Sequence, residues 1–241
     1  MKTVIVSAFF KIPSKQPYHI YYSYLYRWFR AIRSSVIFFT THDVWQDIVS
    51  MGHNLSNVQF HFMSVDDFKA WELGRDFWNR QTERDVEKYH TVELAALWYE
   101  KKEFIKRAMN ISDADIFIWC DAGCVRNNIS ELAMMNFGSR NAPVNDDRIH
   151  IQQIAKIPHS NFYVYPAYKY AGAIIAGNRK AWSNFEMIYR IVMFEYDENK
   201  ISCNSDQYIM ASCNDRMPNF FMEHMAPVSQ IDHWFFFLEI L

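Results

Sequence analysis

The sequence predicts a single α/β domain over residues 1–241, with a mostly parallel central sheet flanked by helices. Segments typical of strands and of helices alternate from the start of the chain, which is the signature of parallel strands joined by covering helices. The strand segments are largely apolar, as expected of strands that are buried on both faces. With 241 residues, 50% of them apolar, and no linker, the chain can build one sizeable core.

The first half of the chain alternates strands with helices. Residues 4–10 form an unbroken apolar run, which predicts a buried first strand. Residues 18–33 carry apolar and aromatic side chains at helical spacing, which predicts a helix. The predicted elements that follow are a strand at 36–40, a helix at 42–49 and a strand at 58–63. This order favours a parallel sheet.

The second half is less regular. Residues 66–88 are densely charged without a clean period, so we expect helical or irregular surface structure there. The clearest helix is predicted at 91–109, where Thr91 can cap the first turn. The remaining predicted elements are a strand at 116–120, helix pieces and a loop with Pro143 and Pro158 in 127–160, a strand at 170–176, helices at 179–195 and 206–213, and an aromatic tail at 234–241 that packs on the core.

Composition and charge argue against several classes of function. A net charge of −2 gives no broad electrostatic reason to expect nucleic acid as a partner. No apolar run is long enough to span a bilayer, and the start lacks a signal-peptide cleavage pattern, so we expect a cytoplasmic protein. The oligomeric state stays open. The cysteines form no dense framework, and we expect reduced thiols at Cys120, Cys124, Cys203 and Cys213.

Three aspartates in the stretch DADIFIWCDAGCVR, residues 113–126, compete for a functional role. Asp113 and Asp115 spell D-x-D, but they precede the strand predicted at 116–120. Asp121 follows that strand, and Gly123 allows the backbone to approach a ligand closely. Because ligands of open α/β sheets collect beyond the carboxyl ends of the strands, we expect Asp121 at the ligand edge. Asp113 and Asp115 then belong to a solvated turn at the opposite edge.

The string WCDAGCVR, residues 119–126, resembles the W-C-D-x-G-C-x-R hallmark of the HtrL/YibB family, also called WlaTC-like glycosyltransferases, which have a GT-A-type fold. The resemblance extends along most of the chain. The further matching segments are TVIVSAFF at 3–10, ELAALWYEKKEF at 93–104, YAG at 170–172, SDQ at 205–207 and WFF at 234–236. It implies transfer of a sugar from a nucleotide-sugar donor, such as a UDP- or GDP-sugar, to a glycan or lipid-linked saccharide acceptor.

The resemblance also implies a metal. In metal-dependent GT-A enzymes the D-x-D carboxylates hold Mn²⁺ or Mg²⁺ against the donor phosphates, and the cation neutralises the departing diphosphate. This chain departs from the full motif, because Gly123 occupies the second acidic position. Asp121 then remains as a metal ligand, with His224 as the implied further ligand and His233 as its competitor. The alternative for His224 is a packed or surface histidine.

Asp206 and Gln207 match a D-Q pair that faces the sugar in glycogenin-like enzymes. By this resemblance Asp206 would orient the sugar or acceptor, or act as general base, and Gln207 would face the anomeric carbon. The alternative is a Ser205-Asp206-Gln207 helix start with only a capping role.

Cations and aromatic rings for the nucleotide are also predicted. Lys101 and Arg126 are the cations expected beside the phosphates, although Lys101 could instead be a solvated lysine paired with neighbouring glutamates. Phe9 or Phe10, at the end of the first strand, would stack on the base or belong to the core.

Two other functions stay open. A catalytically degenerate GT-A protein would bind a nucleotide or glycan without turnover. An α/β nucleotide-binding or interaction protein would use Asp121 structurally.

Overall fold

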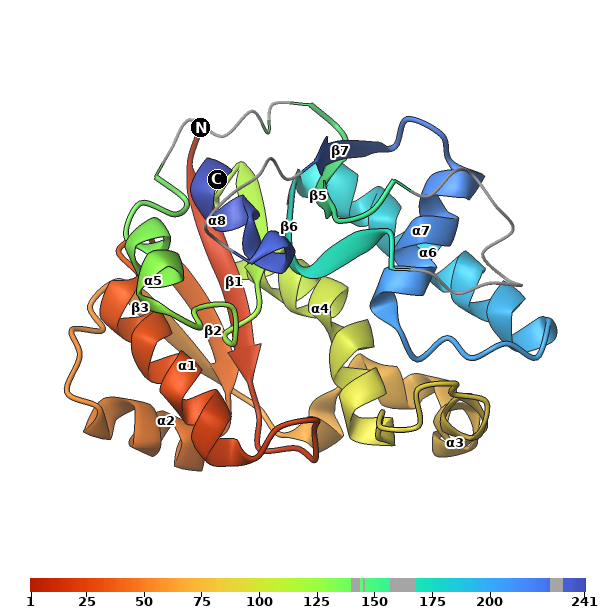
Figure 1. The fold of residues 1–241 in the computed structure, drawn as a ribbon, viewed down its shortest axis with the longest axis horizontal. Helices are drawn as coiled ribbons and strands as arrows, with labels where there is room; N and C mark the ends of the chain where they lie inside the picture. The colour runs from red at the N-terminus through yellow and green to blue at the C-terminus, as the bar shows by residue number, and fades with distance from the viewer. Residues whose placement is uncertain (140–143, 145, 157–167, 226–231) are drawn as a thin grey trace.

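The computed structural model describes residues 1–139, 144, 146–156, 168–225 and 232–241. Its central layer is one seven-stranded sheet (Figure 1). The strands are β1 (Thr3–Phe9), β2 (Val36–Thr40), β3 (Val58–Phe62), β4 (Ile116–Cys120), β5 (Ile149–Gln153), β6 (Tyr170–Asn178) and β7 (Phe221–Met225). They lie in the order β3-β2-β1-β4-β6-β5-β7. Among the strands of the described residues, β6 alone runs antiparallel to its neighbours, so the predicted α/β class with a mostly parallel sheet is confirmed.

Helices cover both faces of the sheet. One face packs against α1 (Tyr18–Ala31), α2 (His42–Ser50), α5 (Asn128–Met134) and α8 (Phe237–Ile240). The other face packs against α3 (Arg75–Glu83), α4 (Val92–Ile111), α6 (Arg179–Glu198) and α7 (Asp206–Arg216). Three short 3₁₀ helices complete the described structure: η1 (Val65–Asp67), η2 (Lys69–Leu73) and η3 (His233–Phe235).

The two faces explain the apolar strands. In β4, Phe117 and Trp119 enter the α4 side, whereas Ile118 and Cys120 enter the α1 side, and all of these side chains are buried. Successive side chains of a strand point to opposite faces, so a strand covered twice must be apolar at every position. Each large side chain buried this way contributes about 1.5–3 kcal/mol.

Most predicted elements are found within a few residues of their expected bounds. Thr91 caps α4 as predicted, because its hydroxyl accepts a hydrogen bond from the Leu94 amide at 3.2 Å. The charged segment 66–88 contains part of η1 and all of η2 and α3. The aromatic tail packs on the core as expected, through Phe235, Phe236, Phe237, Leu238 and Leu241.

Strand β5 was not predicted within 127–160. Its sequence IHIQQ is too polar for a buried strand, but His150 and Gln152 find polar partners inside. His150 contacts His224, and the Gln152 side-chain oxygen accepts a hydrogen bond from the Phe237 amide at 3.1 Å. Pro143 and Pro158, predicted in a loop here, lie outside the described residues.

Two further expectations concern cysteines and membrane spans. The four cysteines are free and buried. Within the described ranges, no helix combines the length and apolar character that crossing a bilayer requires.

Candidate active site

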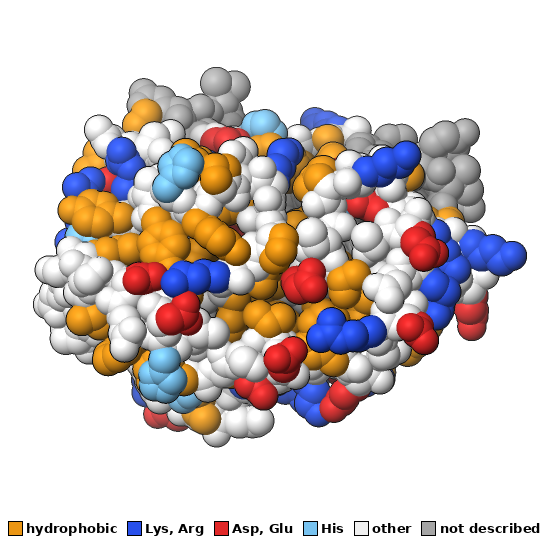
Figure 2. Space-filling model, turned by 90° about the horizontal axis from the view of Figure 1, so that it is seen from below, with side chains coloured by type: hydrophobic (Ala, Val, Ile, Leu, Met, Phe, Trp, Pro, Cys, Tyr) orange, Lys and Arg blue, Asp and Glu red, His pale blue; other side chains and the backbone are white. Residues whose placement is uncertain are grey.

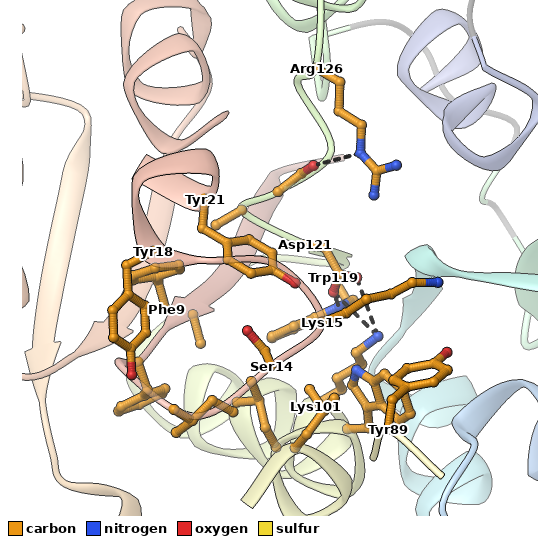
Figure 3. A pocket seen from close by; sticks show the side chains of 18 of the residues that line it. Phe9, Ser14, Lys15, Tyr18, Tyr21, Tyr89, Lys101, Trp119, Asp121 and Arg126 are labelled. Atoms are coloured by element: carbon orange, nitrogen blue, oxygen red, sulfur yellow. Dashed lines mark hydrogen bonds and ion pairs between the residues drawn. The ribbon is translucent and has the colours of Figure 1, made fainter. Parts of the chain in front are cut away.

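A cavity of about 270 Å³ opens beside the carboxyl ends of β1 and β4. In Figure 1 the arrow of β1 points down, and Figure 2 views the molecule from that side, where hydrophobic side chains gather across the middle of the face. Figure 3 shows the cavity from close by. Its wall is mainly aromatic, with Phe9, Tyr18, Tyr21, Tyr89, Trp98 and Phe235. A cavity at this edge agrees with the rule for ligand sites in open α/β sheets.

Asp121 lines this cavity, directly after β4. Its amide donates a hydrogen bond to the Ala173 carbonyl of β6 at 2.8 Å, which fixes the backbone. The Trp119 indole Nε1 donates to Asp121 Oδ1 at 2.6 Å, and about 35% of the Asp121 side chain remains exposed. Asp113 and Asp115 lie at the opposite edge of the sheet, where both contact Lys2, as the sequence predicts.

Lys101 reaches Asp121 from the middle of α4 (Figure 3). Its Nζ donates to Asp206 Oδ2 at 2.8 Å and to the Gly172 carbonyl at 2.9 Å. The same Nζ lies 3.3 Å from Asp121 Oδ1. An ammonium has three donors, so these oxygens use its full capacity. Lys101 is therefore the residue that joins the two carboxylates, and it is not a solvated lysine paired with helix neighbours.

Burial and neighbouring charges together shift the pKa values of Asp121 and Lys101. Burial raises the pKa of Asp121, Lys101 opposes this effect, and the charge of Asp206 adds to it. Burial acts to lower the pKa of Lys101, but Asp121 and Asp206 outweigh it and raise that pKa above its ordinary value. The lysine is thus an ammonium at neutral pH. When all three groups are ionised, two carboxylates and one ammonium leave a net charge of −1.

Asp206 and Gln207 do not line the cavity wall. Asp206 begins α7, its side chain is about 8% exposed, and Lys101 contacts it from the cavity side. Gln207 Nε2 donates to the Tyr170 carbonyl of β6. The Ser205 side chain makes no capping hydrogen bond, so the alternative of a simple Ser205 cap is not found.

The structure does not bring His224 to Asp121. His224 lies on β7, where its Nε2 is 3.0 Å from His150 Nδ1 and its ring packs against Phe237 of the α1 side. Asp121 instead contacts Trp119 and Lys101 on the α4 side. Strands β6 and β5 separate β4 from β7, which amounts to roughly 14 Å at the usual strand spacing.

The structure exposes the other predicted nucleotide-binding residues to different degrees at the cavity: Phe9, Phe10 and Arg126. Phe9 is half-buried in the wall, edge-on to Tyr22 with 5.6 Å between ring centroids. Phe10 is 3% exposed and packs among core aromatic rings. Arg126 is exposed at the rim, with its guanidinium 4.5 Å from the Phe235 ring centroid and its Nε donating to the Gly123 carbonyl.

Some residues that line the cavity were not predicted from the sequence. Lys15 lies in the loop after β1, and its ammonium is 4.9 Å from the centroid of the Tyr89 ring. The rule that ligands collect after strand ends could have found Lys15, since Pro13 and Pro17 mark that loop. Tyr89 and Trp98 come from segments with no such signal.

The donor set does not fit the resident Mn²⁺ or Mg²⁺ that the resemblance implies. Such cations need several oxygen ligands at about 2.0–2.6 Å. Among residues that the structure describes, no three histidine, cysteine, aspartate or glutamate side chains are arranged to hold a metal ion. At Asp121, the Lys101 ammonium already contacts the oxygens that a cation would bind, and its charge would repel the cation.

Comparisons with known proteins give no family assignment. No protein-family model and no curated protein matches the sequence. One similar solved structure is a glycosyltransferase involved in the glycosylation of the major capsid of PBCV-1, at 12% identity and TM-score 0.44, covering 93% of this chain and 82% of that one. Another is CMP:2-keto-3-deoxy-manno-octonic acid synthetase complexed with CTP, at 13% identity and TM-score 0.46, covering 94% and 92%. The function is therefore inferred from the geometry and charges of the site.

Proposed function

We propose that this protein is a glycosyltransferase that moves a sugar from a nucleotide-sugar donor, such as a UDP- or GDP-sugar, to a hydroxyl of a glycan or lipid-linked saccharide. The observation that carries the proposal is the combination of an aromatic cavity, two exposed basic residues, Lys15 and Arg126, and the accessible Asp121 carboxylate at the carboxyl edge of the sheet. The resemblance of WCDAGCVR to the HtrL/YibB family points to the same chemistry.

The aromatic wall suits the nucleoside, and the basic residues suit the diphosphate. Tyr18, Tyr21 and Trp98 offer ring faces or edges for a base, and Phe9 belongs to the same wall. Lys15 and Arg126 are exposed, and no carboxylate in the described part of the chain forms an ion pair with either. Asp121, Asp206 and Lys101 together carry a net charge of −1. Adding Lys15 and Arg126 changes the net charge to +1, which favours binding of an anionic donor.

Asp121 is the proposed proton acceptor. In the reaction the acceptor oxygen bonds to the anomeric carbon, the bond from that carbon to the diphosphate breaks, and the hydroxyl proton needs a base. Among the described residues, Asp121 is the carboxylate that faces the cavity, and burial holds its pKa above the usual range, which makes it a stronger base than an ordinary aspartate. Asp206, predicted as the base, contacts Lys101 instead and is proposed as a positioning residue.

The test combines nucleotide binding with turnover. UDP or GDP at about 100 times its Kd should add roughly 2.7 kcal/mol to the free energy of unfolding. For a chain of this size the melting temperature should then rise by roughly 5–10 °C. In donor-hydrolysis assays over a panel of UDP- and GDP-sugars, Asp121→Asn should lower kcat by about 10²–10⁴-fold and leave nucleotide binding in place.

Asp113→Asn is the matched control, because Asp113 lies at the opposite edge and should leave both readouts unchanged. Binding without turnover in the wild-type protein would instead support the degenerate binding protein, for which Gly123 at the second acidic position is the motivating observation. No stabilisation by any nucleotide would refute both proposals.

A further inference from the structure

We infer that the Lys101 ammonium takes the place of a divalent cation between Asp121 and Asp206, so that the site binds its nucleoside-diphosphate ligand without a metal. The nature of the ligand rests on the proposed function. The role of Lys101 rests on the geometry of the side chains alone.

The Lys101 ammonium is coordinated by oxygen atoms of the protein. Three oxygens from three elements surround Lys101 Nζ: Asp121 after β4, the Gly172 carbonyl in β6, and Asp206 at the start of α7. These segments are far apart in sequence, and Lys101 contacts all three of them. A hard cation would use oxygen donors of the same kinds, so the lysine and a metal compete for one place.

The Lys101 ammonium cannot leave its place between the two carboxylates without a large cost in free energy. Asp206 packs so closely on β6 that a methyl group added at Gly172 would lie 2.7 Å from Asp206 Oδ2. The Lys101 ammonium is 5.9 Å from the centroid of the Trp119 ring, and the lysine side chain is about 8% exposed. Moving the ammonium aside would leave Asp206 buried and unpaired, which is strongly unfavourable.

The negative charge of the diphosphate is met by residues other than Lys101. All three donors of Lys101 are already used inside the protein, so Lys101 holds Asp121 and Asp206 in place and adds positive charge beneath the cavity. Lys15 and Arg126 are exposed at the cavity and are left to contact the phosphate oxygens directly. Arginine suits phosphate because its planar fork donates two parallel hydrogen bonds.

Direct Mn²⁺ titration followed by electron paramagnetic resonance tests the inference on nucleotide-free protein. The wild-type chain should show no specific Mn²⁺ site, whereas Lys101→Ala, which frees both carboxylates and the Gly172 carbonyl, should gain Mn²⁺ affinity by at least about tenfold. Lys101→Met keeps the volume of the stem and gives the same readout if the alanine variant does not fold. A merely structural lysine would not produce this gain.

A second measurement uses the wild-type protein. The affinity for UDP or GDP, followed by calorimetry, should change by less than about twofold when Mg²⁺ is replaced by excess EDTA. Loss of nucleotide binding in EDTA would overturn the inference, as would a wild-type Mn²⁺ site that disappears in Asp121→Asn. A folded Lys101 variant that gains no Mn²⁺ affinity would overturn it too. If no nucleotide binds under any condition, the proposed function fails, while the Mn²⁺ titration still decides the role of Lys101.

Discussion

Asp121 and Lys101 come to one site from two unlike positions in the chain. Asp121 directly follows a buried strand, so a rule about strand ends is enough to place it at the ligand edge. Lys101 lies in the middle of a helix, and its partners are 20, 71 and 105 residues away along the chain. Such contacts depend on how β6 and α7 pack, which no local pattern encodes.

Gly172 is the residue whose size the site depends on most directly. A Cβ there would lie 2.7 Å from Asp206 Oδ2, and Asp206 cannot move away without losing Lys101. We expect Gly172→Ala to lower the free energy of unfolding by about 1–3 kcal/mol and to weaken nucleotide binding. Urea denaturation and calorimetry measure the two effects.

Gly123→Ala is the matched control for this substitution. A Cβ at Gly123 meets nothing closer than Tyr21 and Tyr24 at 3.9 Å, so stability should stay within about 0.5 kcal/mol of wild type. Equal stability of the Gly172 and Gly123 variants would show that Asp206 is not held as tightly as the structure indicates.

Among the strands, the apolar β2 and β4 were predicted from the sequence, whereas the polar β5 was not. Strands β2 and β4 are apolar at most positions, and both have the predicted bounds. Strand β5 could not be predicted because the partners of its buried polar side chains, His224 of β7 for His150 and the Phe237 amide of α8 for the Gln152 oxygen, are distant in sequence. The antiparallel direction of β6 was equally hidden. That direction matters for function, since it brings the start of β6, with Gly172, to the carboxyl edge beside Asp121.

The histidine pair that joins β5 and β7 should make stability depend on pH. Burial, followed by the charges of His150 and Arg148, lowers the pKa of His224 from 6.5 to about 4, and burial also lowers the pKa of His150. Asp146, which contacts His150, opposes both shifts. Between these pKa values the unfolded chain binds a proton that the folded chain does not, so stability falls as pH drops from about 6.5 to about 4. Because the His224 ring is only part-buried, solvent screening keeps its contribution below the roughly 3.4 kcal/mol that a shift of this size would give at full burial.

Urea unfolding at pH values from 7.5 down to 4.5 measures this dependence. His224→Gln removes the titrating ring, so its stability should fall less steeply over the window than that of the wild type. His233→Gln is the control, because His233 is exposed and should leave the slope unchanged. Parallel curves for wild type and His224→Gln would contradict the role given to this pair.

At the scale of the whole molecule, both hydrophobic cores depend on the same sheet. In β2, Ile37 and Phe39 belong to the core on the α4 side, while Val36 and Phe38 belong to the core on the α1 side. Strands β1 and β4 divide their side chains in the same way. Losing either core therefore exposes strands that the other core needs. We propose on this ground that residues 1–241 form one domain.

One domain implies one cooperative unfolding transition. Trp28 is buried in the α1-side core and Trp182 in the α4-side core, so each can report on its own side of the sheet. Replacing Trp28 by phenylalanine leaves the signal of the buried tryptophans to the α4-side core (Trp78, Trp119 and Trp182), whereas replacing those three leaves Trp28 as the buried reporter of the α1 side. In each variant the urea midpoint from fluorescence should coincide with the midpoint from far-ultraviolet circular dichroism, because the sheet and both cores are lost together. Fluorescence midpoints that differ from the circular dichroism midpoint, in opposite directions for the two variants, would show that the two sides of the sheet unfold separately and that the chain is not a single domain.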